Sequence, residues 1–281
     1  MLTSGTSQLR SSDASLEAAR GSLRETLSAL RNLEQLLKSI RVGPRALSSV
    51  IPDVHASCQS LAPTVSALLT AVAGQLSDPA PTQELEAFAV PRAKELVDAL
   101  GKARRKTLTA KKRLDLEQLV AVKTNELDAV RALAECLDEA SSGRQVHIDL
   151  TQLAQQALAA GGETAGPRAH IGLTAERLGE ELLVNPKVAT QLIVLGASAV
   201  TDGGQRPAQL TISPAAGGGC QLRLRALDVA PEGAFTVGLP AKIQPAATCL
   251  NAVAALSGAK LGDASGELVL TWGPDATRAS G

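Results

Sequence analysis

The stretch that most constrains the fold of this chain is 183–204, with the sequence LVNPKVATQLIVLGASAVTDGG. Its apolar residues recur three and four positions apart, at Val188, Leu192, Leu195 and Ala199. This spacing places them on one face of a helix. Asn185 followed by Pro186 is a helix-start signal, and Gly203-Gly204 is a stop signal. The pattern predicts a helix, and its nearly continuous apolar character indicates that this helix is buried against a sheet.

The composition sets the kind of core that the chain can build. The 281 residues suffice for two domains, and 44% of them are hydrophobic. With one Trp, two Phe and no Tyr, the cores must be aliphatic, and binding of single-stranded nucleic acid by base stacking is disfavoured. The 28 basic residues balance the 28 acidic ones, so no global field attracts nucleic acid or an anionic membrane.

Cysteine usage and the N-terminal sequence indicate the compartment. Four scattered cysteines without a CxxC pair are expected to be buried thiols in a reducing cytosol, namely Cys58, Cys136, Cys220 and Cys249. The first residues lack a signal-peptide pattern. The longest apolar run, 61–74, is shorter than the roughly 20 residues that a membrane span requires. We therefore expect a cytoplasmic protein without a membrane span, and no sequence motif indicates a metal or cofactor.

The N-terminal half is predicted to be all-α. Residues 1–12 are Ser/Thr-rich and are expected to form a disordered tail. Residues 13–140 are expected to form a helical bundle of coiled-coil-like hairpins, of the kind that dimerises. Leucines repeat every seven residues at the start of this region, at Leu16, Leu23, Leu30 and Leu37. The expected helical segments are 13–41, 45–76, 83–101 and 102–140, with breaks or kinks at Pro52, Pro63 and Pro91.

The pattern changes after an expected linker at 141–145. Residues 146–275 are expected to form an α+β sandwich, followed by a short tail at 276–281. Period-two alternation predicts strands at 209–213, 221–227 and 267–272. Gly217-Gly218-Gly219 is expected to turn the first of these strands into the second. Further helices are expected at 150–160 and 245–256.

The order of these elements resembles the core of a sensor histidine kinase over about residues 110–275. That family joins a dimerising helical domain to a Bergerat-type ATP-binding domain. VHIDL at 146–150 is similar to the family's first strand and VDL motif, and 184–200 to its central helix, DPxxLxQVLxNLLxNA. GAKL at 258–261 stands where the family has GGxI. The resemblance implies a sheet covered by helices, with a nucleotide site beside the central helix.

The chain departs from the family at the residues that would hold Mg-ATP. By the resemblance, the Asn that holds magnesium corresponds to Ala199 and the preceding Asn to Leu195. An alanine methyl cannot ligate a hard cation, which requires oxygen. The DxGxG motif for adenine corresponds to 228–232, in which Asp228 is kept but Ala230 and Glu232 replace the glycines. Glu232 would place negative charge near the phosphates. The glycine-rich GxGxGL lid corresponds to 245–250, PAATCL, which contains no glycine.

The three histidines are candidates for the phospho-acceptor that such a kinase needs. His147 and His170 are interpreted as structural or surface residues of strands or loops. His55 lies in the helical half, as a family acceptor would, but Ala56 follows it where the family has an acid, and the next proline, Pro63, comes eight rather than five residues on. Two interpretations of His55 therefore remain open. It is a candidate phospho-acceptor, or it is a partly buried helix histidine.

One strongly basic run, KARRKTLTAKKR at 102–113, carries no acid. Its charged residues are partner-binding candidates: Lys102, Arg104, Arg105, Lys106, Lys111, Lys112 and Arg113. Two alternatives remain open, a solvated helix face or contact with an acidic surface such as a response-regulator receiver. Nucleic acid is disfavoured because no helix-turn-helix or RNA motif accompanies the run.

Three functions are compatible with this pattern. The favoured one is a non-catalytic, dimeric histidine-kinase-like scaffold that works through protein–protein contacts. The alternative is a histidine phosphotransferase that relays phosphate between response regulators through a bundle histidine, which needs no nucleotide. A genuine ATP-dependent kinase is the third, and the losses at 199, 230 and 245–250 count against it.

Overall fold

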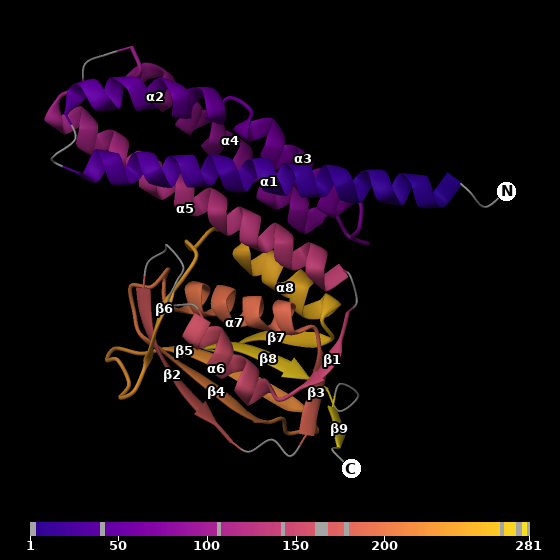
Figure 1. Ribbon diagram of the computed structural model, residues 1–281. Coiled ribbons are helices and arrows are strands. Elements are labelled where there is room, and N and C mark those ends of the chain that lie inside the picture. Colours follow the sequence, from indigo (N-terminus) through magenta and orange to yellow (C-terminus); the bar gives the residue numbers. More distant parts are fainter. Residues whose placement is uncertain are drawn as a thin grey trace. The chain divides into compact units, whose positions relative to one another are not determined.

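The computed structural model describes residues 4–39, 43–105, 108–141, 144–160, 168–176, 180–264, 267–273 and 277–279. The chain divides into two compact units, Met1–Ala134 and Glu135–Gly281. The first unit is helical and the second is an α/β unit (Figure 1). This agrees with the expected helical region followed by a sheet-containing domain.

The first unit is built from long helices that pack side by side. They are α1 (Ser4–Lys38), α2 (Pro44–Cys58), α3 (Leu61–Ala73), α4 (Ala80–Ala103) and the larger part of α5 (Ala110–Ser141). Helix α1 packs against α2 and α3, and α4 also contacts both of these. Ion pairs join α5 to its neighbours, from Asp128 to Arg31 of α1 and from Glu126 to Arg92 of α4.

The heptad leucines of α1 form the core of this unit. Leu16 is 4% exposed, and Leu23 and Leu30 are fully buried. This burial takes place within one chain, because α2 and α3 cover the stripe. The sequence correctly predicts a helix with an apolar seam, but the seam is filled by the chain's own helices. A second copy of the chain would have to use another surface.

Helix boundaries in this unit differ from expectation in several places, and α5 begins at Ala110 rather than at residue 102. Helix α1 already begins at Ser4, so residues 4–12 of the expected tail are helical, which serine permits at a cost of only about 0.5 kcal/mol per residue. The segment 45–76 is split between Cys58 and Leu61, and Pro63 falls in the first turn of α3, where its missing N–H is tolerated. Pro52 and Pro91 lie inside helices that continue past them.

Within the described part of the chain, residues 46–73 form the only helical stretch that is long and apolar enough to cross a membrane. This stretch is interrupted between α2 and α3. Its large apolar side chains, such as Ile51, Leu61 and Leu68, are buried among the other helices rather than turned outward. Of the most apolar window of this stretch, 33% is buried.

In its described residues, the second unit contains two sheets and three helices of its own. The elements are β1 (Val146–Ile148), α6 (Leu150–Ala160), β2 (Arg168–Ala175), β3 (Glu180–Val184), α7 (Pro186–Val200), β4 (Ala208–Pro214), β5 (Cys220–Ala226), β6 (Phe235–Gly238), α8 (Ala246–Leu256), β7 (Ala259–Ala264), β8 (Glu267–Trp272) and β9 (Thr277–Ala279). The large sheet has the order β6-β2-β4-β5-β8-β7, in which only β2 and β4 are parallel. A small antiparallel sheet has the order β1-β3-β9.

The two faces of the large sheet differ in chemistry. One face is apolar, and Leu210, Leu224 and Leu270 on it are fully buried. Helices α6, α7 and α8 pack side by side on this face (Figure 1). A methyl group at Gly196 of α7 would come within 3.0 Å of Leu224, which shows how closely this helix approaches the strands. The other face carries polar residues such as Gln209 and Arg223, and no helix covers it among the described residues.

The strongest patterns of this half are confirmed. The expected helix at 183–204 is α7, the strands at 209–213, 221–227 and 267–272 are β4, β5 and β8, and the glycine turn joins the first two. The pattern does not predict β2, β3, β6, β7 and β9, which are short or lack clean alternation. Strand β9 lies in the expected tail, and the expected linker contains the end of α5 at Ser141.

The four cysteines are buried thiols that form no disulfide, as expected. Burial raises the pKa of the Cys58 thiol to about 12 and that of Cys220 to about 12. Such thiols stay protonated at neutral pH and act as small apolar groups. They belong to the packing of the two units.

Candidate functional site

The start of α7 is fixed by one asparagine. The Asn185 side chain accepts hydrogen bonds from the backbone N–H groups of Lys187 (3.0 Å) and Val188 (3.3 Å). Its amide nitrogen donates to the Glu139 backbone oxygen and to Glu139 Oε1. Asn185 is buried, so this arrangement uses both its acceptor and its donors. The helix start predicted from Asn185-Pro186 is therefore confirmed, and it also holds the last turn of α5.

Glu139 is held as a carboxylate by these contacts. Burial alone would raise its pKa, but the hydrogen bonds from Asn185 and Lys187 and the charges of Lys187 and Arg144 outweigh burial, so the pKa of Glu139 lies below its ordinary value. Hydrogen bonds that favour the ionised form have this effect.

The end of α7 places a carboxylate beside a cavity. Thr201 closes the helix, since its hydroxyl donates to the Ala197 carbonyl (2.7 Å) and accepts from the Gly204 N–H (3.0 Å). The next residue, Asp202, adopts a left-handed backbone with φ of 56°, which Asp tolerates better than most residues, and Gly203 continues it at 67°. The Asp202 carboxylate accepts a hydrogen bond of 2.7 Å from Lys242 Nζ.

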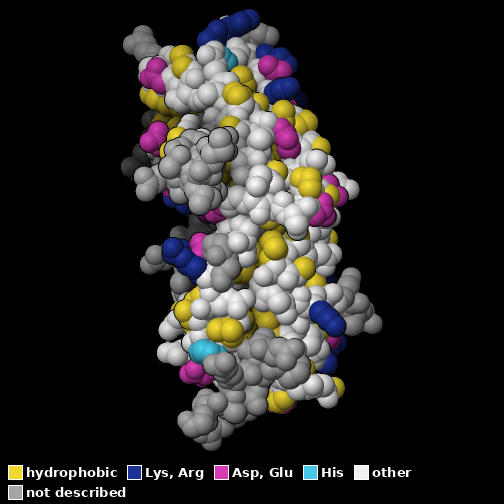
Figure 2. Space-filling model, turned by 90° about the vertical axis from the view of Figure 1, so that its right-hand side faces the viewer, with side chains coloured by type: hydrophobic (Ala, Val, Ile, Leu, Met, Phe, Trp, Pro, Cys, Tyr) yellow, Lys and Arg dark blue, Asp and Glu magenta, His cyan; other side chains and the backbone are white. Residues whose placement is uncertain are grey.

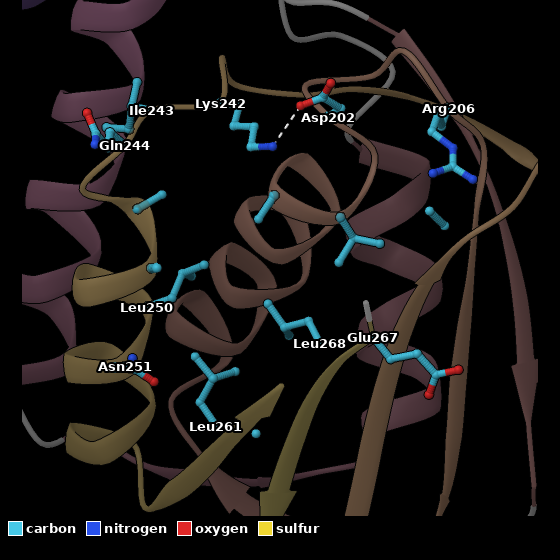
Figure 3. A pocket seen from close by; sticks show the side chains of 16 residues that line it. Asp202, Arg206, Lys242, Ile243, Gln244, Leu250, Asn251, Leu261, Glu267 and Leu268 are labelled. Atoms are coloured by element: carbon cyan, nitrogen blue, oxygen red, sulfur yellow. Dashed lines mark hydrogen bonds and ion pairs between the residues drawn. The ribbon is translucent and has the colours of Figure 1, made fainter. Parts of the chain in front are cut away.

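The cavity lies between α7, α8 and the strands β5, β7 and β8, and its volume is about 1060 Å³. This volume is at the upper end of the range of small-molecule sites. Apolar side chains line most of it: Ala199, Val200, Ala226, Ile243, Ala246, Ala247, Leu250, Leu261 and Leu268. Figure 3 shows Asp202, Arg206 and Lys242 at one end, with Leu250, Leu268 and Leu261 below them. The cavity thus has Asp202, Arg206 and Lys242 at one end, while Asn251 and Glu267 lie level with the leucines.

The charges at the rim are paired. Lys242 pairs with Asp202, and Arg206 pairs with Asp228 at 2.8 Å. The hydrogen bond from Lys242, the charge of Lys242 and the charge of Arg206 lower the pKa of Asp202, so it is ionised at neutral pH. The other lining charge, Glu267, stands apart from this cluster, with its carboxylate 3.6 Å from the Arg225 guanidinium. Both pairs that hold the lining cations are about half exposed or more, and such pairs are easily exchanged.

The residues proposed to mark a lost nucleotide site do not all meet at this cavity. Ala199 lines it, and so do Ala246, Ala247 and Leu250 from the segment that replaces the glycine-rich lid. Asp228, Ala230 and Glu232 are not among its lining residues. The Asp228 side chain is 93% exposed. The structure therefore brings together two of the three segments that the resemblance assigns to nucleotide binding.

The course of the loop after β5 explains why Asp228 is absent from the cavity. A methyl group at Gly172 of β2 would lie 2.4 Å from Gln209 Oε1 and 2.6 Å from Pro231 Cγ. Gln209 points to the open face of the sheet, where it bonds Thr174. Pro231 therefore lies on that face, opposite the helices and the cavity. The chain then continues into β6 at the outer edge of β2, so Glu232 is not beside the lid segment, contrary to the expectation that it would face the phosphates.

The donor set of the cavity does not fit a magnesium nucleotide. Ala199 offers a methyl group, and Asp202 is occupied by Lys242. Mg²⁺ requires an octahedron of oxygen ligands. Across the described residues, no three His, Cys, Asp or Glu side chains are grouped closely enough to hold a metal ion. The N-terminus of α8 begins after Pro245 with no side-chain cap and none of the glycines that let a backbone wrap around phosphate.

His55 is buried in the helical unit. It is 7% exposed, with Nδ1 3.4 Å from Arg104 Nη1 and Nε2 3.1 Å from the position that a Gly101 methyl would occupy. Burial, and then the charges of Arg104 and Arg105, lower the pKa of the ring, so the neutral form is favoured. A neutral imidazole is nucleophilic, but both nitrogens face α4 here. This geometry agrees with the interpretation of His55 as a buried helix histidine.

His147 and His170 lie on strands β1 and β2 and are exposed. His170 Nδ1 is 3.4 Å from the Thr236 hydroxyl of the neighbouring strand β6. His147 was expected to be a satisfied structural residue, whereas its side chain is exposed on a three-residue strand.

The basic run occupies the end of α4 and the start of α5, and its members have different roles. Arg113 donates to the carbonyl oxygens of Leu37 (2.7 Å), Leu36 (2.9 Å) and Ser39, so it caps the C-terminus of α1. Arg104 contacts His55. The side chains of Lys102, Arg105, Lys111 and Lys112 are exposed. Lys106 lies outside the described residues.

Sequence reasoning missed Asp202, Arg206 and Lys242, which form the polar end of the cavity. The Asp202 signal was weak, because a lone Asp before Gly-Gly reads as an ordinary helix end. Lys242 is 40 residues away along the chain, and only the fold brings it to Asp202.

Among known proteins, the chain is similar to solved structures of low sequence identity. No protein-family model matches the chain, and no curated protein matches it. Among solved structures, full-length ShkA in complex with AMPPNP is similar at 20% identity and a TM-score of 0.40, over 70% of this chain and 47% of that one. The blue-light-activated histidine kinase EL346 of Erythrobacter litoralis is similar at 13% identity and a TM-score of 0.25, over 68% and 58%. This chain spans about half the length of these neighbours.

Proposed function

We propose that this protein is a non-catalytic histidine-kinase-like protein, a scaffold or signalling module that acts by contact with protein partners. The proposal rests on the order of its sequence motifs and on the chemistry of the cavity in the second unit. The expected partners are response-regulator receivers and a second copy of the chain.

The observation that carries the proposal is the place of Ala199. It lines the cavity at the end of α7, where the resemblance implies an asparagine that holds magnesium. Replacing an oxygen ligand by a methyl group removes a contact that a hard cation cannot do without. The carboxylate at this end of the cavity, Asp202, forms an ion pair with Lys242. We therefore infer that this unit contacts protein partners through its surface and does not act as a kinase.

Dimerisation, if it occurs, requires a surface other than the α1 leucines, because the chain's own helices cover them. On the face shown in Figure 2, the hydrophobic side chains of the described residues lie in small groups separated by polar and charged ones. The exposed apolar side chains of α5, Leu114 and Val122, are candidates for part of such a contact.

Phosphate relay through His55 is the second candidate, and the neutral ring, favoured by burial and then by Arg104 and Arg105, supports it. It would require α2 and α4 to separate, because the ring is covered in the present arrangement. We therefore rank it below the scaffold.

The experiment is a labelled-phosphate assay on the full chain. The protein is incubated with γ-labelled ATP and Mg²⁺, and separately with a phosphorylated receiver domain, each beside His55→Ala. The scaffold proposal expects no label on the chain in either arm. Label from the receiver that is lost in His55→Ala would replace it by the phosphotransferase. Label from ATP would contradict both.

A further inference from the structure

The cavity in the second unit has two cations at one end and three leucines below them, and this arrangement indicates a ligand class. We infer that this cavity binds a small organic monoanion with an apolar body, such as a medium-chain carboxylate. The inference rests on the proposed function, in which the cavity does not bind Mg-ATP. The anionic head would lie at Lys242 and Arg206, and the body along Leu250, Leu268 and Leu261.

The head site follows from the charges that face the cavity. Lys242 and Arg206 both line it, and of their two carboxylate partners only Asp202 does so as well. Asp228, which pairs with Arg206, is outside the lining. One positive charge at this end is therefore not balanced within the cavity. Because both pairs are half exposed, a ligand carboxylate can replace Asp202 or Asp228 at little cost.

The body site follows from the shape and lining below the charges. Leu250, Leu261 and Leu268 come from α8, β7 and β8, and Figure 3 shows all three directed into the same space. Rigid elements of the sheet and helix layer carry them, so the apolar surface is preformed. Burial of a ligand's methylene groups there supplies affinity, while the head fixes its orientation. Gln244 and Asn251 add amide groups to this lining.

The chemistry also excludes other classes. A polyphosphate carries several negative charges and needs several donors or a metal, whereas this end of the cavity provides two cations. An ammonium head would meet Lys242 and Arg206. Glu267, the remaining acidic lining residue, is paired with Arg225 and lies apart from the head site.

The test is isothermal titration calorimetry of the full chain with decanoate at pH 7. Two control compounds are titrated in the same way. Acetate has the carboxylate without the long alkyl chain, and decylammonium has the alkyl chain with a positive charge. We expect saturable binding of decanoate only. Binding of decylammonium as tight as that of decanoate would overturn the assigned charge preference, and absence of decanoate binding would overturn the site.

Two variants at the head site should act in opposite directions. Lys242→Met removes a cation and should weaken decanoate binding about fivefold, whereas Asp202→Asn frees Lys242 and should strengthen it about threefold. Asn also tolerates the left-handed backbone at this position. Lys260→Met makes the same charge change beside the lining residue Leu261 but on an exposed neighbour outside the lining, and should leave the affinity unchanged. Equal effects of Lys242→Met and Lys260→Met would contradict the proposal.

The body site is tested by occlusion. Ala247 lines the cavity and is exposed, so Ala247→Trp fills space without disturbing the core, and should abolish decanoate binding. Retained binding would place the ligand elsewhere.

A final experiment repeats the decanoate titration in the presence of Mg-ATP. Displacement by Mg-ATP would contradict the proposed function, whereas failure of decanoate alone contradicts only this inference.

Discussion

At the scale of single residues, the second unit depends on one buried asparagine. Asn185 caps α7 and bonds the last turn of α5 through Glu139, so two helices share one side chain. The sequence predicted the capping role from Asn-Pro alone. The bond to Glu139 spans 46 residues and had no local signal.

Replacement of Asn185 should destabilise the second unit. Asn185→Ala loses the cap and leaves Glu139 without its amide donor, and we expect a loss of about 2 kcal/mol. Asn185→Ser keeps a capping oxygen and should fall between this variant and the wild type. Urea unfolding followed by the fluorescence of Trp272, the only tryptophan and a residue of β8, reports this unit. Equal stability of Asn185→Ala and wild type would contradict the assigned role.

His55 should make stability depend on pH. Burial and the neighbouring Arg104 and Arg105 lower the pKa of the folded ring below the ordinary value of about 6.5. The unfolded chain then binds a proton that the folded chain does not, so stability falls as pH drops below about 6.5. In His55→Gln this fall should be smaller, as measured by urea unfolding at pH 7.5 and 5.5. His170→Gln removes an exposed imidazole and should retain the wild-type fall.

At the scale of elements, the helices and strands that the sequence predicts are those with a clear local pattern. Helix α7 carries a start signal, an apolar stripe and a stop signal, and β4 and β5 alternate cleanly around three glycines, so all three were predictable. Strand β6 has four residues and lies beside β2 only because the preceding loop crosses the open face of the sheet. That crossing is set by Pro231 against Gly172, a contact that no local pattern encodes.

The basic run shows the same limit. Its sequence suggests a uniform charged surface, yet the structure uses Arg113 as the cap of α1. A guanidinium can reach three carbonyls at once because its donors form a planar fork. Partner binding therefore remains a proposal for the exposed Lys102, Arg105, Lys111 and Lys112.

Loss of the Arg113 cap should destabilise the helical unit. Arg113→Ala leaves the carbonyls of Leu36, Leu37 and Ser39 without their donor, and we expect a loss of about 2 kcal/mol. Lys112→Ala removes the adjacent exposed charge and should change stability by less than about 0.5 kcal/mol. Thermal unfolding monitored by helical circular dichroism distinguishes the two variants. Similar small effects of both would mean that Arg113 is an ordinary surface cation.

At the scale of the whole molecule, the sequence predicted two regions of different architecture, and the structure has them. What it could not show is where the leucine stripe of α1 is buried, because a heptad pattern is the same whether the partner helix belongs to the same chain or to another. In this chain α2 and α3 fill that role.

A core leucine separates these alternatives by experiment. Leu23 is fully buried, and Leu23→Ala should cost the helical unit about 2–5 kcal/mol. The oligomeric mass measured by light scattering should stay that of the wild type wherever the variant is folded. A variant that keeps its stability but dissociates from a dimer to a monomer would show that the stripe is an intermolecular seam.

The proposed function requires that the cavity beside α7 does not bind a magnesium nucleotide. Calorimetric titration of the full chain with Mg-ATP at neutral pH measures such binding, with Mg²⁺ alone as the control. We predict no saturable heat up to about 1 mM nucleotide, because Ala199 offers no oxygen to the metal. Saturable binding with a Kd below about 100 µM would contradict the claim.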